Sequence, residues 1–247
     1  MRNLDPFAPV RKERLYTADK TPSNQFAVFV KDVELKQEME VGTVSDTYQL
    51  VANEDVYQTG LDVLTRSEQD FEPSITRFDG KKYRQRWVLP NLNIEPRKGD
   101  IVQLAVDVIN SYDGSTTFGL SFAARRLVCL NGMQIDYRLG SYKFRHHNRP
   151  EYQQELAEAA NHVGKLVKHL EPLKDKISEL ISTPVDRTYI QGMFNELKLG
   201  QGLVGQIYMN LEEDTQWGLY NACTSVLTER GAHSDDNLNR RISKIFI

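Results

Sequence analysis

The chain has 247 residues, of which 40% are hydrophobic and 26% are charged, a composition typical of a soluble globular protein. Its formal net charge of −3 excludes a general polyanion-binding protein, so binding of nucleic acid requires a locally basic face. No apolar run reaches the length needed to span a bilayer, and the first residues lack the apolar segment of a secretory signal. Cys129 and Cys223 are the two cysteines; without CxxC spacing they indicate a reducing compartment.

The N-terminal third is predicted to contain an arm, a strand and a helix. Residues 1–24 are expected to be a flexible basic arm, because Pro6, Pro9 and Pro22 interrupt regular structure. Residues 26–35 read as a strand. Residues 54–65 predict a helix with Asn53 as its N-cap.

Two Asp-Gly turns predict an antiparallel meander. The first, at residues 79–80, separates strands at 74–78 and 82–89, and the second, at residues 113–114, separates strands at 101–109 and 117–122. Pro90 and Pro96 are expected in the loop that joins the two hairpins.

The strand at 82–89 carries a cationic stripe. Period-two alternation places Lys82, Arg84 and Arg86 on one face of this strand. The opposite face carries Tyr83, Gln85 and Trp87. A basic face with interleaved aromatic residues is typical of nucleic-acid binding, and a solvated sheet face is the alternative.

The second half of the chain is predicted to be helical. Residues 151–181 carry apolar residues at seven-residue spacing in two series: Leu156, Val163, Leu170 and Ile177, and Ala159, Leu166, Leu173 and Leu180. They predict a long amphipathic helix, broken near Leu170 by Pro172, that packs on the chain's own sheet or forms a coiled-coil seam. Further helices are expected at 188–199 and 217–227, separated by glycines.

These elements predict an α+β fold, an antiparallel β-meander packed against a long amphipathic helix with a helical C-terminal region. We expect the arm at 1–24, an α+β core domain at 25–183 and a helical region at 184–247 packed on the core.

No spacing typical of a phosphate loop, a zinc protease, a serine hydrolase or a kinase is present, so we expect no enzyme, cofactor or metal. A metal-dependent nuclease that uses Asp107 and Asp113 is the last-ranked alternative. Asp113 is already explained by its turn, and Asp107 has no acidic neighbour at metal-site spacing.

Residues 142–149 form a basic segment with aromatic and histidine residues. His146 and His147 are adjacent, and adjacent residues on an extended segment point to opposite sides, which disfavours binding of one metal ion by both. The segment suits contact with a polyanion, and a solvated basic loop is the alternative. Arg125 and Arg126 are expected to point to opposite faces of a strand, so that one is structural and the other faces the surface that would bind nucleic acid.

Several segments resemble the phage/plasmid-like protein family, a domain of unknown function (number nine-three-two). They are residues 78–80, 110–115, 126–133, 145–147 and 217–222. The resemblance implies a role in the DNA metabolism of mobile elements, in the cytoplasm of the host. The order of elements is also similar to that of phage single-strand annealing proteins, which implies a homo-oligomeric ring or filament. That likeness further implies a phage exonuclease or single-strand-binding protein as partners.

We therefore predict a non-enzymatic protein that binds single-stranded DNA and promotes annealing or recombination as an oligomer. The alternative is a virion-associated or assembly protein without nucleic-acid binding. The predicted DNA-binding residues are Lys81, Lys82, Arg84, Arg86, Trp87, Tyr112, Arg125, Arg126, Tyr142, Lys143, Arg145, His146, His147 and Arg149.

Overall fold

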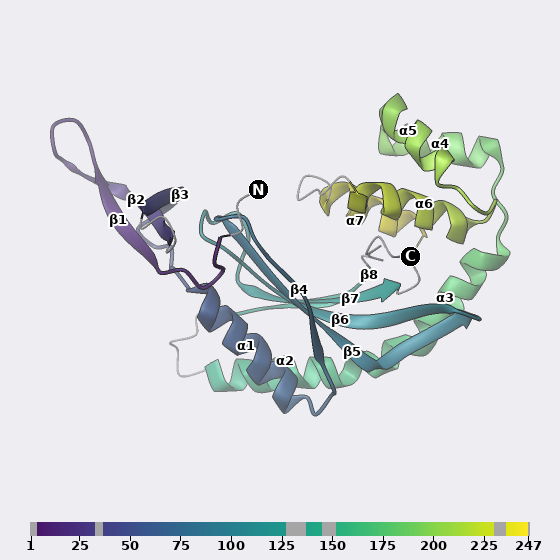
Figure 1. Ribbon diagram of the computed structural model, residues 1–247, viewed down its shortest axis with the longest axis horizontal. Coiled ribbons are helices and arrows are strands. Elements are labelled where there is room, and N and C mark those ends of the chain that lie inside the picture. Colours follow the sequence, from purple (N-terminus) through teal and green to yellow (C-terminus); the bar gives the residue numbers. More distant parts are fainter. Residues whose placement is uncertain (1–3, 33–36, 127–136, 145–151, 230–235, 247) are drawn as a thin grey trace. The chain divides into compact units, whose positions relative to one another are not determined.

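The computed structural model of the protein describes residues 4–32, 37–126, 137–144, 152–229 and 236–246 (Figure 1). At the ends of some elements, Arg125 and Arg126 among them, it describes the backbone alone. The described residues form two sheets and a series of helices, which confirms the α+β prediction. None of the helices in these ranges is long and apolar enough to cross a bilayer.

The first sheet has three antiparallel strands in the order β1-β2-β3. Their bounds are Val10–Tyr16 for β1, Pro22–Asp32 for β2 and Gln37–Ser45 for β3. The predicted arm at 1–24 is therefore wrong for residues 10–16 and 22–24. The prolines lie at strand boundaries: Pro22 is the first residue of β2, and the carbonyl of Pro9 accepts a hydrogen bond from Lys31 N–H.

The second sheet has five strands in the order β4-β5-β6-β7-β8, so each strand pairs with its neighbours in the chain. The strands are β4 Glu72–Phe78, β5 Lys82–Arg97, β6 Asp100–Ser111, β7 Gly119–Arg126 and β8 Tyr137–Lys143. Both predicted Asp-Gly turns join neighbouring strands, with Gly80 at φ +94° and Gly114 at φ +72°. These are left-handed conformations that glycine adopts without a steric cost.

β5 continues through Pro90 and Pro96, so the loop predicted there is wrong. The pairing between β4 and β5 runs from Phe78↔Tyr83 to Glu72↔Val88. Beyond Val88, β5 extends past the end of β4. A proline there lies where no N–H has to be donated to β4.

The predicted long helix is broken where expected. It consists of α2 Tyr152–Lys165, a 3₁₀ turn η1 Leu166–His169 and α3 Leu170–Ser182. Pro172 lies in the first turn of α3, where its missing N–H costs no helical hydrogen bond. The heptad residues of α2 and α3 are mostly buried within the chain, Val163 and Ile177 completely, so their stripe is not an exposed coiled-coil seam.

The chain divides into two compact units. The first contains Met1–Leu89, Val106–Phe122 and Gly140–Lys165, and the second contains Pro90–Ala105, Ala123–Leu139 and Leu166–Ile247. The predicted boundary between residues 183 and 184 lies within the second unit.

In the first unit, α1 Asn53–Arg66 packs on the second sheet through Gly60. A Cβ atom at position 60 would lie 2.7 Å from the Trp87 ring and 2.7 Å from a Val108 methyl group. Asn53 begins the helix and is not its N-cap, which is Ala52 without a side-chain cap. The predicted cap is therefore wrong, because the Asn53 side chain is used in a buried network described below.

In the second unit, α4 Arg187–Leu197 and α6 Gln216–Glu229 confirm the two predicted C-terminal helices. Two further helices are α5 Gln201–Met209, in the predicted glycine separator, and α7 Asp236–Phe246. α5 forms because Leu203 and Ile207, one turn apart, are buried, while Gly202 and Gly205 face open space.

Candidate nucleic-acid interface

The β4–β5 hairpin is shaped by its turn. The Asp79 carboxylate accepts hydrogen bonds from the backbone N–H groups of Lys81 and Lys82, at 2.8 and 2.7 Å. This arrangement is that of an Asx turn, which satisfies two backbone donors with one side chain. Lys81 is exposed and Lys82 is half-buried at the start of β5.

The predicted alternation of β5 is present. Tyr83 and Trp87 are buried on the face that α1 covers, and Lys82, Arg84 and Arg86 belong to the opposite face. The hairpin register brings one more cation to that face, because Arg77 of β4 pairs directly with Arg84.

Arg77 was not predicted, although the sequence contains the signal. Counting outward from the Asp79-Gly80 turn along both strands pairs residue 77 with residue 84. Arg77 is exposed, and Arg84 is half-buried. Two like charges directly opposite each other in a sheet are unfavourable, so this face concentrates positive charge at some cost to the fold.

Arg86 lies inside the molecule rather than on a free surface. Its side chain is 3% exposed, and its Nε and Nη2 atoms donate to the two carboxylate oxygens of Asp107 at 2.5 and 2.6 Å. Arg84 Nε lies 3.9 Å from the same carboxylate. Direct contact between Arg86 and DNA is therefore not available in this structure, which corrects that expectation.

The pair also bears on the nuclease alternative. Both oxygens of Asp107 are engaged by the Arg86 guanidinium, which competes with any cation for the same lone pairs. Within the described part of the chain, no group of three His, Cys, Asp or Glu side chains is placed to hold a metal ion.

We will call Arg77, Lys81, Lys82 and Arg84 the cationic face. Each has at least part of its side chain at the surface. Asp107 pairs with the buried Arg86, Asp79 accepts from two backbone N–H groups of the turn, and the charge of Lys82 helps to lower the pKa of Asp113. The cationic face therefore gathers four basic residues on one hairpin of a chain whose formal net charge is −3.

Three of the predicted DNA-binding residues, Trp87, Tyr112 and Tyr142, are aromatic and were expected to stack on bases; Trp87 and Tyr112 are each 1% exposed. Trp87 packs beneath Gly60 of α1, and the Tyr112 hydroxyl accepts a hydrogen bond from Asn53 N–H at 3.0 Å. Burial raises the pKa of Tyr112 to about 12. Because both rings are buried, neither can stack on a base in this structure. The prediction was wrong here because strand alternation predicts the direction of a side chain and not what covers it.

Tyr142 and Lys143 of β8 point to different faces. The Tyr142 hydroxyl donates to Glu158 of α2 at 3.0 Å, and its ring lies near His162 of the same helix. Tyr142 is therefore on the helix-covered face, half-buried, and not on the cationic face. Lys143 is exposed on the opposite side of β8.

The remaining predicted residues cannot be assigned to a surface. Arg125 and Arg126 lie at the end of β7, but their side chains are outside what the structure describes. Arg145, His146, His147 and Arg149 lie outside the described residues.

The Asn-Ser-Tyr-Asp-Gly segment has a structural role at every position. Asn110 Nδ2 donates to Val51 O at 2.9 Å and to Asn53 Oδ1 at 3.0 Å. Ser111 Oγ accepts from Thr116 N–H and donates to Thr116 O, both at 2.9 Å. With Asp113 Oδ1 accepting from Ser115 N–H, the motif fixes the β6–β7 turn and the start of α1.

The Trp217-Gly218 segment has a similar role in the second unit. Trp217 Nε1 donates to the buried Asp100 carboxylate at 3.0 Å, which ties α6 to the beginning of β6. A Cβ atom at position 218 would lie 2.2 Å from the Glu213 carbonyl oxygen, so only glycine fits there.

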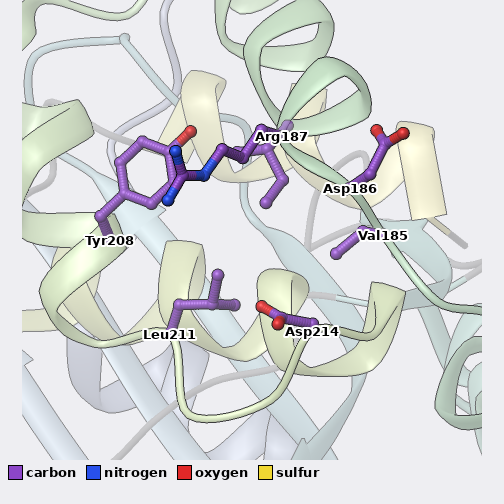
Figure 2. A pocket seen from close by; sticks show the side chains of 7 residues that line it. Val185, Asp186, Arg187, Tyr208, Leu211 and Asp214 are labelled. Atoms are coloured by element: carbon purple, nitrogen blue, oxygen red, sulfur yellow. The ribbon is translucent and has the colours of Figure 1, made fainter.

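A pocket of about 740 Å³ lies between α4 and the end of α5 in the second unit (Figure 2). Its floor includes Leu211, and its charged residues are Arg187, Asp186 and Asp214. Asp186 already caps α4, accepting from Tyr189 N–H at 2.7 Å. With two carboxylates to one guanidinium, this pocket does not favour an anion, and the cationic face remains the candidate interface.

A family model described as "Domain of unknown function (DUF932)" matches residues 40–244. No curated protein and no solved structure matches the chain significantly. The matched region contains the whole cationic face and begins within β3.

Proposed function

Because the chain belongs to the family of the domain of unknown function DUF932, whose description names no activity, we propose its function from the cationic face. We propose that the protein binds single-stranded DNA through phosphate contacts of Arg77, Lys81, Lys82 and Arg84 and promotes annealing without covalent chemistry. The finer elements of this proposal, an oligomer and a phage or plasmid setting, come from the resemblance and not from the geometry.

The observation that carries the proposal is the direct pairing of Arg77 with Arg84. Like charges directly opposite each other in a sheet repel, and the one Asp107 carboxylate near Arg84 is shared with the closer guanidinium of Arg86. A bound phosphate would relieve this repulsion with charge-assisted hydrogen bonds. A polyanion therefore complements the face better than a neutral ligand does.

The burial of Trp87 and Tyr112 favours annealing over sequence readout. A surface that holds phosphates and offers neither of these rings to the bases leaves the bases free to pair with a second strand. Affinity would then depend steeply on salt and little on sequence.

The test compares the native chain with Arg77→Ala/Lys81→Ala, in which both altered residues are exposed. Fluorescence anisotropy on a labelled ~30-nucleotide strand and on its duplex, across a salt series, gives the affinity and its salt dependence. For two lost phosphate contacts, the salt slope on the single strand should become shallower by roughly 1.4. Annealing of complementary strands, followed by energy transfer, should slow in parallel.

Lys165→Ala/Lys174→Ala removes the same charge from exposed helical positions and is the matched control. It should leave both slope and annealing rate near the native values. Equal effects of the two double variants would show that binding depends only on the net charge of the protein, which would contradict binding at the cationic face. Absence of binding by the native chain at low salt would reject the proposal.

A further inference from the structure

The β1–β2 hairpin extends beyond the third strand of its sheet. Pairing of β2 with β3 ends at Gln25↔Ser45, whereas β1 and β2 remain paired out to Tyr16↔Pro22. Residues 15–23, which we call the β1–β2 tip, therefore form a two-stranded ribbon, visible in purple in Figure 1. The tip precedes the region that the family model matches.

The tip is held in one conformation by its own polar groups. Thr17 N–H donates to Thr21 O at 3.0 Å, and Lys20 N–H donates to Thr17 O at 2.9 Å. The Asp19 carboxylate accepts from the hydroxyls of Thr17 and Thr21, and these hydrogen bonds lower the pKa of Asp19. A ligand that docks here meets a turn that is already ordered.

Lys20 occupies a position suited to glycine. Its φ of +65° lies in the left-handed region that residues with a Cβ rarely adopt. Its side chain is exposed, and the neighbouring acidic residue, Asp19, is occupied by the threonines. The strained backbone therefore presents a cation at the extreme end of the ribbon.

An exposed aromatic ring and a second cation lie in the last residues of β1, on the strand that leads to the tip. Two large apolar side chains at the end of β1, Leu15 and Tyr16, are exposed. The exposed fraction of Tyr16 is the higher of the two, at 62%. Arg14 is also exposed, and its guanidinium is held 4.9 Å from the centre of the Phe26 ring. Exposed aromatic rings flanked by cations are the elements with which proteins bind single-stranded nucleic acid.

We propose that the β1–β2 tip is a second contact for single-stranded nucleic acid, in which Tyr16 stacks on a base while Arg14 and Lys20 contact phosphates. This inference rests on the proposed function, because it assumes that a strand is already held on the cationic face. It adds a base contact that the cationic face lacks.

Tyr16→Trp places a fluorescent probe at the tip. The two native tryptophans, Trp87 and Trp217, are buried, so the added emission can be distinguished by its accessibility to a quencher. Acrylamide quenching of the added emission should fall by at least about half when a ~30-nucleotide strand binds, because a stacked indole is shielded. Tyr16→Ala should weaken binding at least about fivefold, as expected for the loss of one stacking contact.

Lys20→Gly separates charge from folding, because glycine relieves the left-handed backbone. It should weaken binding of the strand while the unfolding midpoint stays the same or rises, and Lys174→Ala should leave affinity unchanged. DNA binding with an unshielded Trp at position 16 would overturn the tip contact and leave the proposed function intact. No DNA binding at low salt would reject both the tip contact and the proposed function. If the introduced tryptophan became shielded from acrylamide as the protein concentration rose, in the absence of DNA, the tip would instead contact a second copy of the chain.

Discussion

The side-chain amide of Asn110, in β6, donates to the side-chain carbonyl of Asn53, the first residue of α1, at 3.0 Å. The same amide group donates to Val51 O at 2.9 Å, and Asn53 Nδ2 donates to Pro6 O at 2.9 Å. Both asparagines are buried. This chain of amides joins the N-terminal segment, the start of α1 and β6, and thereby orients the sheet on which the cationic face lies.

Asn110→Ala should therefore lower the free energy of unfolding by about 2–4 kcal/mol, because it leaves two buried acceptors, Val51 O and Asn53 Oδ1, without this donor. Urea unfolding followed by circular dichroism measures the change. Asn93→Ala removes an exposed amide that donates to Pro90 O, and it should cost less than about 1 kcal/mol. Equal costs for the two variants would show that the buried network is not a stabilising element.

Arg86→Met should destabilise the protein by about 3–5 kcal/mol, because it leaves the Asp107 carboxylate buried without its bidentate partner. Arg86→Met/Asp107→Leu should recover much of that loss, since the buried guanidinium and the buried carboxylate are both removed and Arg84 is partly exposed to solvent. Urea unfolding of both variants measures the coupling. If the double variant were as unstable as the single one, the loss would come from packing and not from charge.

The parts of the fold that the sequence predicted correctly depend on short-range signals. An Asp-Gly pair between alternating strands is sufficient for the hairpins at residues 79–80 and 113–114, because turn chemistry and strand period act within a few residues. The break before α3 follows in the same way from Pro172.

The errors involve partners that are distant in sequence. Pro90 can lie inside β5 because the pairing of β5 with β4 ends at Val88. The length of β4, which sets this limit, cannot be inferred from the sequence of β5. Arg86 and Trp87 are on the predicted faces, but Asp107 and Gly60 decide that both are buried. Of the candidate site, Arg77 could have been found by counting the hairpin register, whereas the burial of Trp87 and Tyr112 could not.

Gly218→Ala should destabilise the second unit by about 3 kcal/mol, because the new methyl group would meet the Glu213 carbonyl oxygen at 2.2 Å. Emission from the adjacent Trp217 during urea unfolding measures this loss. Gly192→Ala in α4 is the matched control, since a Cβ atom there meets no atom within 4 Å. It should stabilise the protein by about 0.5–1 kcal/mol through helix propensity, and a loss of equal size in both variants would contradict the steric explanation.

Alkaline pH should destabilise the first unit through Tyr112. Burial raises the pKa of this hydroxyl from 10.0 to about 12, so the folded state retains a proton that the unfolded chain releases above pH 10. The stability that the neutral hydroxyl provides is complete below pH 10 and is lost progressively between pH 10 and 12, with a total of about 2–3 kcal/mol. Tyrosinate absorbance near 295 nm should rise in two steps, the second coincident with loss of circular dichroism.

Tyr112→Phe should lower stability at neutral pH, because Asn53 N–H loses its acceptor, and should flatten the dependence on pH above 10. A pH dependence unchanged in that variant would assign the alkaline transition to other tyrosines, with Tyr83 the first to substitute because burial also raises its pKa.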